Sequence, residues 1–456
     1  MFKNKAIGLL MVLLLCLGLI LTSCTGSKTQ QPTQQQEKEQ STGEQAKEEQ
    51  PKTETPKEKV TIEFWSFWGS VTRRPIIEKI ISDFNGSQDR IQVKYTFVPW
   101  GDIWTKNLAA IAAGNPPDVI INDINTVAHR ANQKQNTNLA PYLAKEKENI
   151  KDRFFPQLWE ATLFNGEPYA LPFNTDTRLL FWNKDHFAQV GLDPEKPPKT
   201  WAELEEYAKK LDVIENGKYK RIGFYPLWGA GVDLWLLNSD GKNFVDKEGN
   251  VYINTPEKVK ALEWLVSWKN RLGEKNVNEF QAQFGSQQAD PFISGKVSMI
   301  IQNMNFYTQL RDYGKNVKYG VTELPAMQEG SGHWSWGGGF VVEIPYGAKH
   351  PDEAYEFMKY LTDVDAQSYW AKWCLDMVAN KEAANTPELQ EIPVYKVAVE
   401  NMKQTLITPV PLFAPDYMGN LVQPQFDAAM LGKVSPQDAL AKAQKDVEDL
   451  IKSNKK

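Results

Sequence analysis

The body of the chain alternates between short strand-like runs and stretches whose apolar residues recur at helical spacing. The runs 60–65 and 91–97 alternate apolar with polar residues, and the run 118–121 is apolar after its first residue. Apolar residues at helical spacing occupy the stretches 75–84 and 104–114 between these runs. The order strand, helix, strand, helix, strand predicts a parallel sheet covered by helices, which is an α/β fold.

Residues with binding chemistry follow these strand-like runs. Ligands of open α/β sheets bind beyond the carboxyl ends of the strands. Aromatic rings and side chains with amide or carboxylate groups are therefore candidates at these ends. In this part of the chain they are Trp65, Trp68, Asn122, Asp123 and Asn125.

The stretch 166–187 contains two apolar runs, 169–173 and 179–182, joined by a polar island. The island reads Asn174-Thr175-Asp176-Thr177-Arg178. A polar segment between two strands is usually a surface turn, but this one has no glycine and no Asn-Gly pair. The alternative is an extended crossover from one packed body to another, with Asn174 and Asp176 facing a cleft. The local pattern leaves both open.

A second unusual segment, 330–340, has the sequence GSGHWSWGGGF. It lacks the lysine and hydroxyl residue of a phosphate-binding loop and does not fit the dinucleotide-binding pattern. Its glycines allow the backbone to bend and to approach a bulky group closely. Trp334, Trp336, Gly337 and Gly338 are therefore cleft candidates, and a purely structural turn is the alternative.

The first 59 residues differ in composition from the rest. Lysines precede an apolar run at 7–20 that is short for a membrane span, and Leu21-Thr22-Ser23-Cys24 follows. This ending is similar to a bacterial lipobox and predicts a lipoprotein signal peptide at 1–23 with lipid on Cys24. An ordinary signal peptide is the alternative. Residues 24–59 are almost entirely polar, so we expect a disordered tether.

Charge, cysteines and histidines argue against several kinds of site. The formal net charge is −5 and no basic block occurs, which disfavours nucleic acid as a partner. Besides Cys16 and Cys24 only Cys374 is present, so we expect no disulfide within the mature chain. The four histidines are scattered and form no zinc motif. We expect neither a metal nor a cofactor.

Several short motifs follow one another in a specific order. They are Ala113-Gly114-Asn115-Pro116-Pro117-Asp118-Val119, Tyr169-Ala170-Leu171-Pro172, Asn183-Lys184-Asp185, Pro198-Lys199-Thr200-Trp201, Gly295-Lys296-Val297-Ser298-Met299, Tyr319-Gly320-Val321-Thr322-Glu323-Leu324-Pro325, Gly337-Gly338-Gly339 and Asp438-Ala439-Leu440. With these motifs the chain resembles the extracellular solute-binding proteins of ABC importers, in the sugar-binding group that includes maltose-binding protein. The resemblance covers almost the whole mature chain.

The resemblance implies a periplasmic-binding-protein-like type II fold, in which a hinge joins two α/β lobes around a ligand cleft. The N-terminal lobe would comprise 60–174 and 323–375, and the C-terminal lobe would comprise 175–322 and 376–456. The chain after residue 59 is long enough for two domains, because one hydrophobic core usually supports no more than about 250–300 residues. The island at 174–178 becomes the first crossover.

The resemblance also implies individual site residues. Asp176 matches a carboxylate that hydrogen-bonds sugar hydroxyls in maltose-binding relatives, and the segment 122–125 matches a polar segment of their site. Asn303 to Phe306 match a segment that carries a sugar-stacking aromatic residue, whose slot is occupied here by Asn305. Tyr417 lies near a further aromatic position.

The expected function is that of an extracellular, lipid-anchored, monomeric receptor. It would bind a mono- or oligosaccharide, deliver it to the transmembrane subunits of an ABC importer and have no enzyme activity. Sugar rings pack on aromatic faces and their hydroxyls bind charged or amide groups, which adds Trp228 to the candidates. One alternative is a secreted glycoside hydrolase that uses Asp123 and Asp176. Another is a peptide or polyamine receptor of the same fold.

Replacement of Cys24 by alanine tests the lipobox. The Cys24→Ala protein should leave the membrane fraction, because the thiol that would carry the lipid is gone. Cell fractionation and immunoblotting measure this, and Cys374→Ala is the matched control that should remain with the membrane. A Cys24→Ala protein that stays membrane-bound with its leader cleaved would contradict the lipoprotein interpretation.

Overall fold

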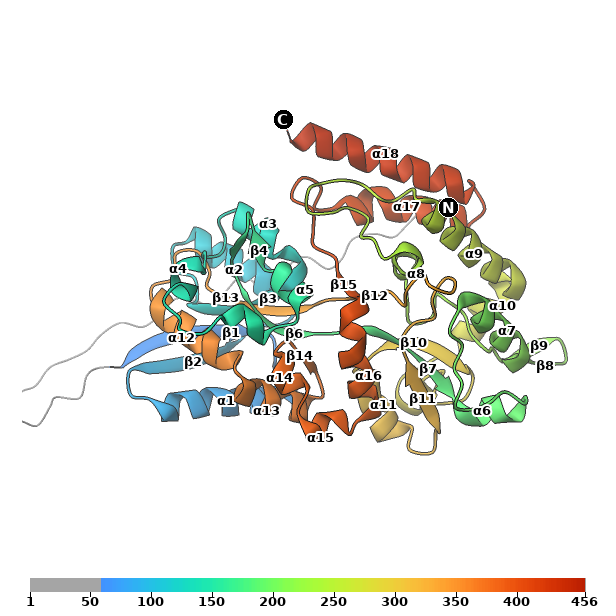
Figure 1. Cartoon of the computed structure of the whole chain (residues 1–456), viewed down its shortest axis with the longest axis horizontal. Helices are drawn as coiled ribbons and strands as arrows, with labels where there is room; N and C mark the ends of the chain where they lie inside the picture. Colours follow the sequence, from blue (N-terminus) through green and yellow to red (C-terminus); the bar gives the residue numbers. More distant parts are fainter. Residues whose placement is uncertain (1–58, 456) are drawn as a thin grey trace, which may run out of the picture. The chain divides into compact units, whose positions relative to one another are not determined.

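The computed structural model describes residues 59–455 of the protein (Figure 1). The expected signal peptide, the lipidation site Cys24 and the tether up to residue 58 lie outside the described residues. None of the helices within 59–455 combines the length and the apolar character needed to cross a membrane. The same part of the chain contains no group of three or more His, Cys, Asp or Glu side chains that could hold a metal ion.

Six strands form the larger sheet, in the order β14-β6-β13-β3-β1-β2. They are β1 (Val60–Ser66), β2 (Ile91–Phe97), β3 (Val119–Asp123), β6 (Leu171–Thr175), β13 (Gly339–Glu343) and β14 (Met377–Val378). β1 pairs in parallel with β2 and β3, which confirms the sheet predicted from the order of elements. β13 runs antiparallel to β3 and β6, so a strand from much later in the chain lies in the middle of this sheet.

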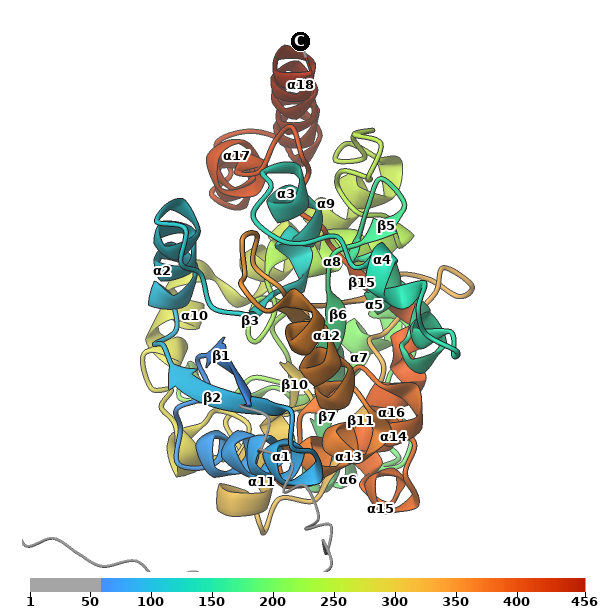
Figure 2. The same cartoon turned by 90° about the vertical axis from the view of Figure 1, so that its left-hand side faces the viewer.

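Helices α1 (Arg73–Ser87) and α12 (Pro351–Leu361) pack against this sheet (Figure 2). The apolar residues of α1 at helical spacing are buried, as predicted. Phe357 of α12 meets Phe64 of β1 edge-to-face, with 5.4 Å between the ring centroids. Full burial of such a side chain stabilises by about 1.5–3 kcal/mol. The ends of these strands are therefore held by a packed core.

The smaller sheet has the order β10-β7-β11, with both outer strands antiparallel to β7. Its strands are β7 (Arg178–Asn183), β10 (Met299–Asn303) and β11 (Tyr319–Thr322). The Thr200 hydroxyl accepts a hydrogen bond from the Glu203 N–H at 3.3 Å and caps α7 (Trp201–Leu211). Trp201 stacks on Trp264 with 4.3 Å between centroids. Tryptophans on these helices belong to the core.

The remaining helices and strands complete two groups of elements, one around each sheet. The longer helices are α2 (Asp102–Ala112), α8 (Val232–Asp240), α9 (Pro256–Leu272), α10 (Glu274–Gln281), α11 (Phe306–Tyr313), α13 (Val364–Cys374), α16 (Pro393–Asn401), α17 (Gln423–Met430) and α18 (Pro436–Asn454). The short helices are α3 (Val127–Asn132), α4 (Ala140–Leu143), α5 (Pro156–Glu160), α6 (Lys184–Gln189), α14 (Lys381–Ala384) and α15 (Pro387–Gln390). Short strands are β4 (Leu163–Phe164), β5 (Glu167–Pro168), β8 (Val213–Glu215), β9 (Lys218–Arg221), β12 (Ser335–Gly337) and β15 (Thr405–Ile407).

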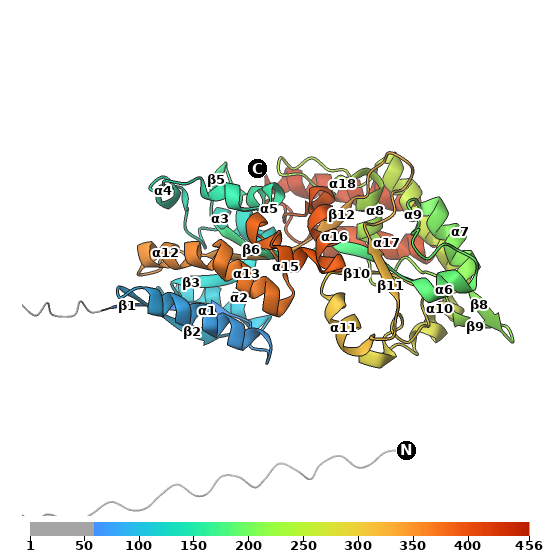
Figure 3. The ribbon, with the colours of Figure 1, turned by 60° about the horizontal axis from the view of Figure 1, so that its bottom comes forward.

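The chain passes between the two groups of elements three times. The first passage joins β6 directly to β7, so the polar island at 174–178 is a crossover and not a turn within one sheet. The second passage contains β12 and the third contains α16, and both elements are labelled in Figure 3. The third passage also contains β15, which pairs in parallel with β12. Thr177 of the first passage shares hydrogen bonds with the hydroxyls of Ser335 at 3.2 Å and Thr405 at 2.7 Å. This buried hydroxyl junction ties the three passages together.

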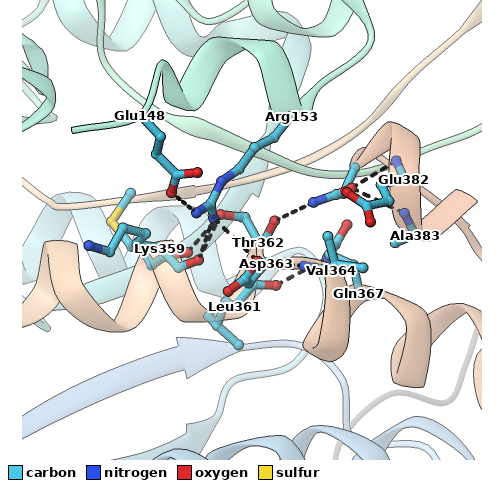
Figure 4. A network of polar contacts seen from close by, with 12 residues as sticks. Glu148, Arg153, Lys359, Leu361, Thr362, Asp363, Val364, Gln367, Glu382 and Ala383 are labelled. Atoms are coloured by element: carbon cyan, nitrogen blue, oxygen red, sulfur yellow. Dashed lines mark hydrogen bonds and ion pairs between the residues drawn. The ribbon is translucent and has the colours of Figure 1, made fainter. Parts of the chain in front are cut away.

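The first part of the third passage is held by hydrogen bonds to the larger sheet and the helices beside it. Asn380 donates its side-chain N–H to the Thr362 carbonyl at 3.1 Å and accepts from the backbone N–H groups of Glu382 and Ala383. Figure 4 shows Thr362, Glu382 and Ala383 at this point of the fold. β14 just before it pairs with β6. This segment lies just past the expected lobe boundary at 375/376.

The beginning of the second passage is attached instead to elements around the smaller sheet. Ala326 exchanges backbone hydrogen bonds with Lys199 and Trp201, both at 2.9 Å. Residues just past the expected boundary at 322/323 therefore remain with the smaller sheet.

The glycines of the second passage approach the first passage closely. A Cβ at Gly337 would lie 2.0 Å from the Asp176 carbonyl oxygen, and one at Gly339 would lie 2.1 Å from that of Asn174. A Cβ at Gly338 would meet only the Asn125 amide nitrogen, at an ordinary 3.7 Å. The bulky neighbour expected for these glycines is thus the backbone of the first crossover.

These neighbouring glycines provide a matched pair of variants. Gly337→Ala should lower the free energy of unfolding by about 1–3 kcal/mol, because the new methyl group overpacks the crossovers. Gly338→Ala should change it by less than about 0.5 kcal/mol. Urea denaturation followed by circular dichroism measures both. Equal stability of the two variants would show that the passages are not packed as closely as the structure has them.

Candidate functional site

A cavity of about 360 Å³ lies where β6 enters the first passage. Four residues predicted from the sequence line it, namely Trp68, Asn174, Asp176 and Asn305. We call it the crossover cavity. A larger cavity of about 720 Å³ lies between other segments, and none of the predicted residues lines it.

Asp176 occupies a central position at this cavity. One carboxylate oxygen accepts a hydrogen bond from the Gly338 N–H at 2.8 Å, and the other accepts from Arg178 Nη1 at 2.7 Å. The Arg178 guanidinium in turn lies 4.4 Å from the centre of the Trp336 ring. The Asp176 side chain remains 26% exposed. An ionised carboxylate has about four acceptor positions, so it can still bind hydroxyl groups of a ligand.

Three further candidates follow β3. Asn122 is buried and donates to Glu343 at 3.1 Å, and Glu343 pairs with the buried guanidinium of Arg130. Asp123 accepts from the Asn125 N–H at 2.7 Å, and burial raises the pKa of its carboxyl. Asn122 and Asp123 are thus engaged within the fold. The side-chain oxygen of Asn125 is buried without a hydrogen-bond partner in the described chain, and the nitrogen of the same amide lies near Gly338.

The structure therefore brings together candidates that are far apart in the sequence. Asn125, Asp176, Trp336, Gly337 and Gly338 meet where the first two passages touch. The indole N–H of Trp336 is also buried without a partner in the described residues. Unpaired buried polar atoms of this kind are costly unless a ligand or water satisfies them.

The other candidates are buried or half-buried within the fold. Trp228 is 6% exposed, stacks on Phe280 and donates its N–H to Gln281. Trp334 donates to the Ser331 carbonyl within its own loop. Phe306, Tyr417, Trp68 and Asn174 are also buried, whereas Trp65 is half-buried beside a small cluster of apolar residues. Asn303 and Asn305 are half-buried and line a cavity next to the crossover cavity.

Only the fold places Asp233 close enough to Tyr417 for its charge to act on the Tyr417 hydroxyl. Burial raises the pKa of both groups, and the Asp233 charge adds to the effect on Tyr417. Asp233 also feels the positive charge of Arg178. Asp233 was not among the predicted residues, because it starts an apolar helix and no motif distinguishes it.

An aromatic wall lines part of the crossover cavity, and its residues were not among those predicted from the sequence. It consists of Phe67, Trp100 and Phe340. Trp100 meets Phe67 edge-to-face with 4.7 Å between centroids and Phe340 with 5.6 Å, and its side chain is 59% exposed. Trp100 follows the carboxyl end of β2, so the rule that selected Trp65 could have found it.

An ion pair at the cavity joins two residues that no pattern in the sequence connects. Arg73 Nη2 donates to Asp376 Oδ1 at 2.7 Å, although the two residues are 303 positions apart. Trp370 donates its indole N–H to the other Asp376 oxygen at 3.2 Å. The charged side chains at the cavity thus form two pairs, Arg73 with Asp376 and Arg178 with Asp176. Such a site suits an uncharged ligand that offers both apolar faces and hydroxyl groups.

Comparison with known proteins adds an independent observation. Residues 68–368 match the family model of the bacterial extracellular solute-binding proteins. The solved structure of CpMnBP1 with mannobiose bound is 30% identical, covers 86% of this chain and 100% of that chain, and has a TM-score of 0.70. Its complex with mannotriose gives 32% identity, 85% and 100% coverage, and a TM-score of 0.71.

Two further relatives are more distant. The structure of the sugar-binding protein MalE from Xanthomonas citri has a TM-score of 0.73 over 87% of this chain and 98% of that chain, at 19% identity. The sn-glycerol-3-phosphate-binding protein UgpB of Escherichia coli K12 is 24% identical over 283 residues, which is 58% of this chain and 61% of that protein. The fold is the periplasmic-binding-protein-like type II fold, as the motifs implied. The chain belongs to the bacterial extracellular solute-binding protein family.

Proposed function

We propose that the protein is the extracellular carbohydrate receptor of an ABC importer. It binds a mono- or oligosaccharide at the crossover cavity and delivers it to the transmembrane subunits after the cleft closes. The observation that carries this proposal is the cavity itself, which is lined by an aromatic wall with the exposed Trp100 and by charged groups that are already paired. The mannobiose and mannotriose complexes of CpMnBP1 support an oligosaccharide as the ligand.

The physical chemistry of sugars matches these groups. The C–H face of a sugar ring packs on an aromatic ring such as Trp100. Its hydroxyl groups donate to the Asp176 carboxylate and bind the half-buried amide of Asn305. The phosphate group of a phosphorylated ligand would need an unpaired cationic side chain. Arg73 and Arg178 are instead both paired with carboxylates. A polyamine would need unpaired carboxylates.

Anchoring and assembly are part of the proposal. A lipid on Cys24 holds the receptor at the outer face of the cell membrane, and the polar segment 24–59 is the tether between anchor and receptor. The receptor acts as a monomer. Membership of an extracellular family supports the exposed location.

Ligand-induced closure is the first test. Neutral oligosaccharides, glycerol-3-phosphate and spermidine are offered to the protein in a thermal-shift screen, followed by X-ray scattering. A saccharide at 100 times its dissociation constant should stabilise by about 2.7 kcal/mol. The radius of gyration should fall, because only the closed form offers contacts from both sides of the cleft. Stabilisation by glycerol-3-phosphate or spermidine alone would refute carbohydrate binding, and tight sugar binding without compaction would refute closure.

The Asp176 carboxylate is the second test. Asp176→Asn keeps an oxygen that can accept from the Gly338 N–H but removes the charge, so sugar binding should weaken by about 1.5–3 kcal/mol. Isothermal titration calorimetry measures the loss. Asp449→Asn breaks the exposed Lys445 pair on α18 and is the matched control, with no expected effect on affinity. Equal affinities of the two variants would remove Asp176 from the binding site.

A further inference from the structure

A second cavity, of about 480 Å³, adjoins the crossover cavity. Ser70, Arg73 and Asn305 line both, so the two cavities are neighbours along one groove. Asp376 holds the Arg73 guanidinium at their junction. The crossover cavity alone is near the lower end of the roughly 300–1,000 Å³ that is typical of small-molecule sites. A ligand too long for it would continue into the second cavity.

Half of the residues that line the second cavity have amide or hydroxyl side chains. Gln302, Asn303 and Gln309 come from β10 and α11, and Thr72 comes from the opposite side, before α1. An amide both donates and accepts hydrogen bonds, as a sugar hydroxyl does. Two charged residues of the lining, Arg311 and Asp312, pair with each other. The chemistry of this cavity therefore continues that of the crossover cavity towards a neutral, hydroxyl-rich ligand.

Trp373 supplies the aromatic surface of the second cavity. It lies in the last turn of α13 and is 55% exposed, whereas Trp370 one turn earlier is buried. Trp373 lines only the second cavity, and Trp100 lines only the crossover cavity. An exposed indole leaves a large apolar area in water, and covering it with an apolar face is favourable. Each compartment of the groove thus has one exposed tryptophan.

We propose that the second cavity is a distal sugar subsite, in which Trp373 stacks on a ring of an oligosaccharide that extends from the crossover cavity past Arg73. This rests on the proposed function and makes it more specific, because it assigns the receptor to oligosaccharides. Short sugars occupy the crossover cavity alone and do not reach Trp373. Longer chains gain the contacts of Trp373, Asn303 and Gln309.

A chain-length series tests the subsite. Affinities for manno-, cello- and malto-oligosaccharides of one to six rings are measured by titration calorimetry on the mature protein. Affinity should rise with length beyond the shortest ligand that binds. Trp373→Ala should lower the affinity for the longer chains about tenfold and leave that for the shortest ligand unchanged. Trp373→Phe should recover most of the loss, and Trp100→Ala should weaken ligands of every length.

Tyr346→Ala is the matched control, because Tyr346 is 56% exposed and lines neither cavity. It should leave all affinities unchanged, and melting temperatures of all variants check that they are folded. Should Trp373→Ala not fold, Asn303→Ala should show the same length-dependent loss. If Trp373→Ala or Asn303→Ala binds long and short chains as the unaltered protein does, the distal subsite is wrong while the receptor function stands. If no neutral saccharide binds the unaltered protein, the proposed function itself is wrong.

Discussion

The buried hydroxyl junction of Thr177, Ser335 and Thr405 is the constraint on which the rest of the structure depends. Each hydroxyl can donate and accept, so the three satisfy one another where no water can reach. Asn401 adds a hydrogen bond to Thr177 at 2.9 Å. Because the junction ties all three passages together, it sets the positions of the residues beside it.

This junction fixes the positions of two candidate binding residues that are its neighbours in the sequence. Asp176 directly precedes Thr177, and Trp336 directly follows Ser335. The hydrogen bond from Gly338 to Asp176 then joins the first two passages again on the cavity side. Asp176, which could contact a ligand, is therefore also one of the residues that connect the two sheets. A ligand that binds them acts directly on the segments at which a hinge motion would occur.

Electrostatics limits what this site can hold. Arg73 and Arg178 are each committed to a carboxylate, so the cavity has polar groups in fixed orientations but little unbalanced charge. The aromatic wall around Trp100 adds a large apolar area on one side. In the function we propose, recognition depends on the pattern of hydroxyl groups and on the number of apolar ring faces of the ligand.

The sequence alone determined those features that depend on neighbouring residues. Alternation and helical spacing predicted β1, β2, β3 and α1, because residues that share a face of one strand or helix are close in the sequence. The order of short motifs identified the family and, with it, the crossover at 174–178.

Only the tertiary structure decided which polar and aromatic residues line the crossover cavity. Trp100 and Trp228 look alike in the sequence, yet one is exposed and the other is covered by Phe280, because burial depends on elements that pack over a residue from elsewhere in the chain. The Arg73–Asp376 pair joins residues 303 positions apart, and no local pattern encodes such a contact. Local periodicity determines faces of single elements, whereas the packing of distant elements determines which faces meet.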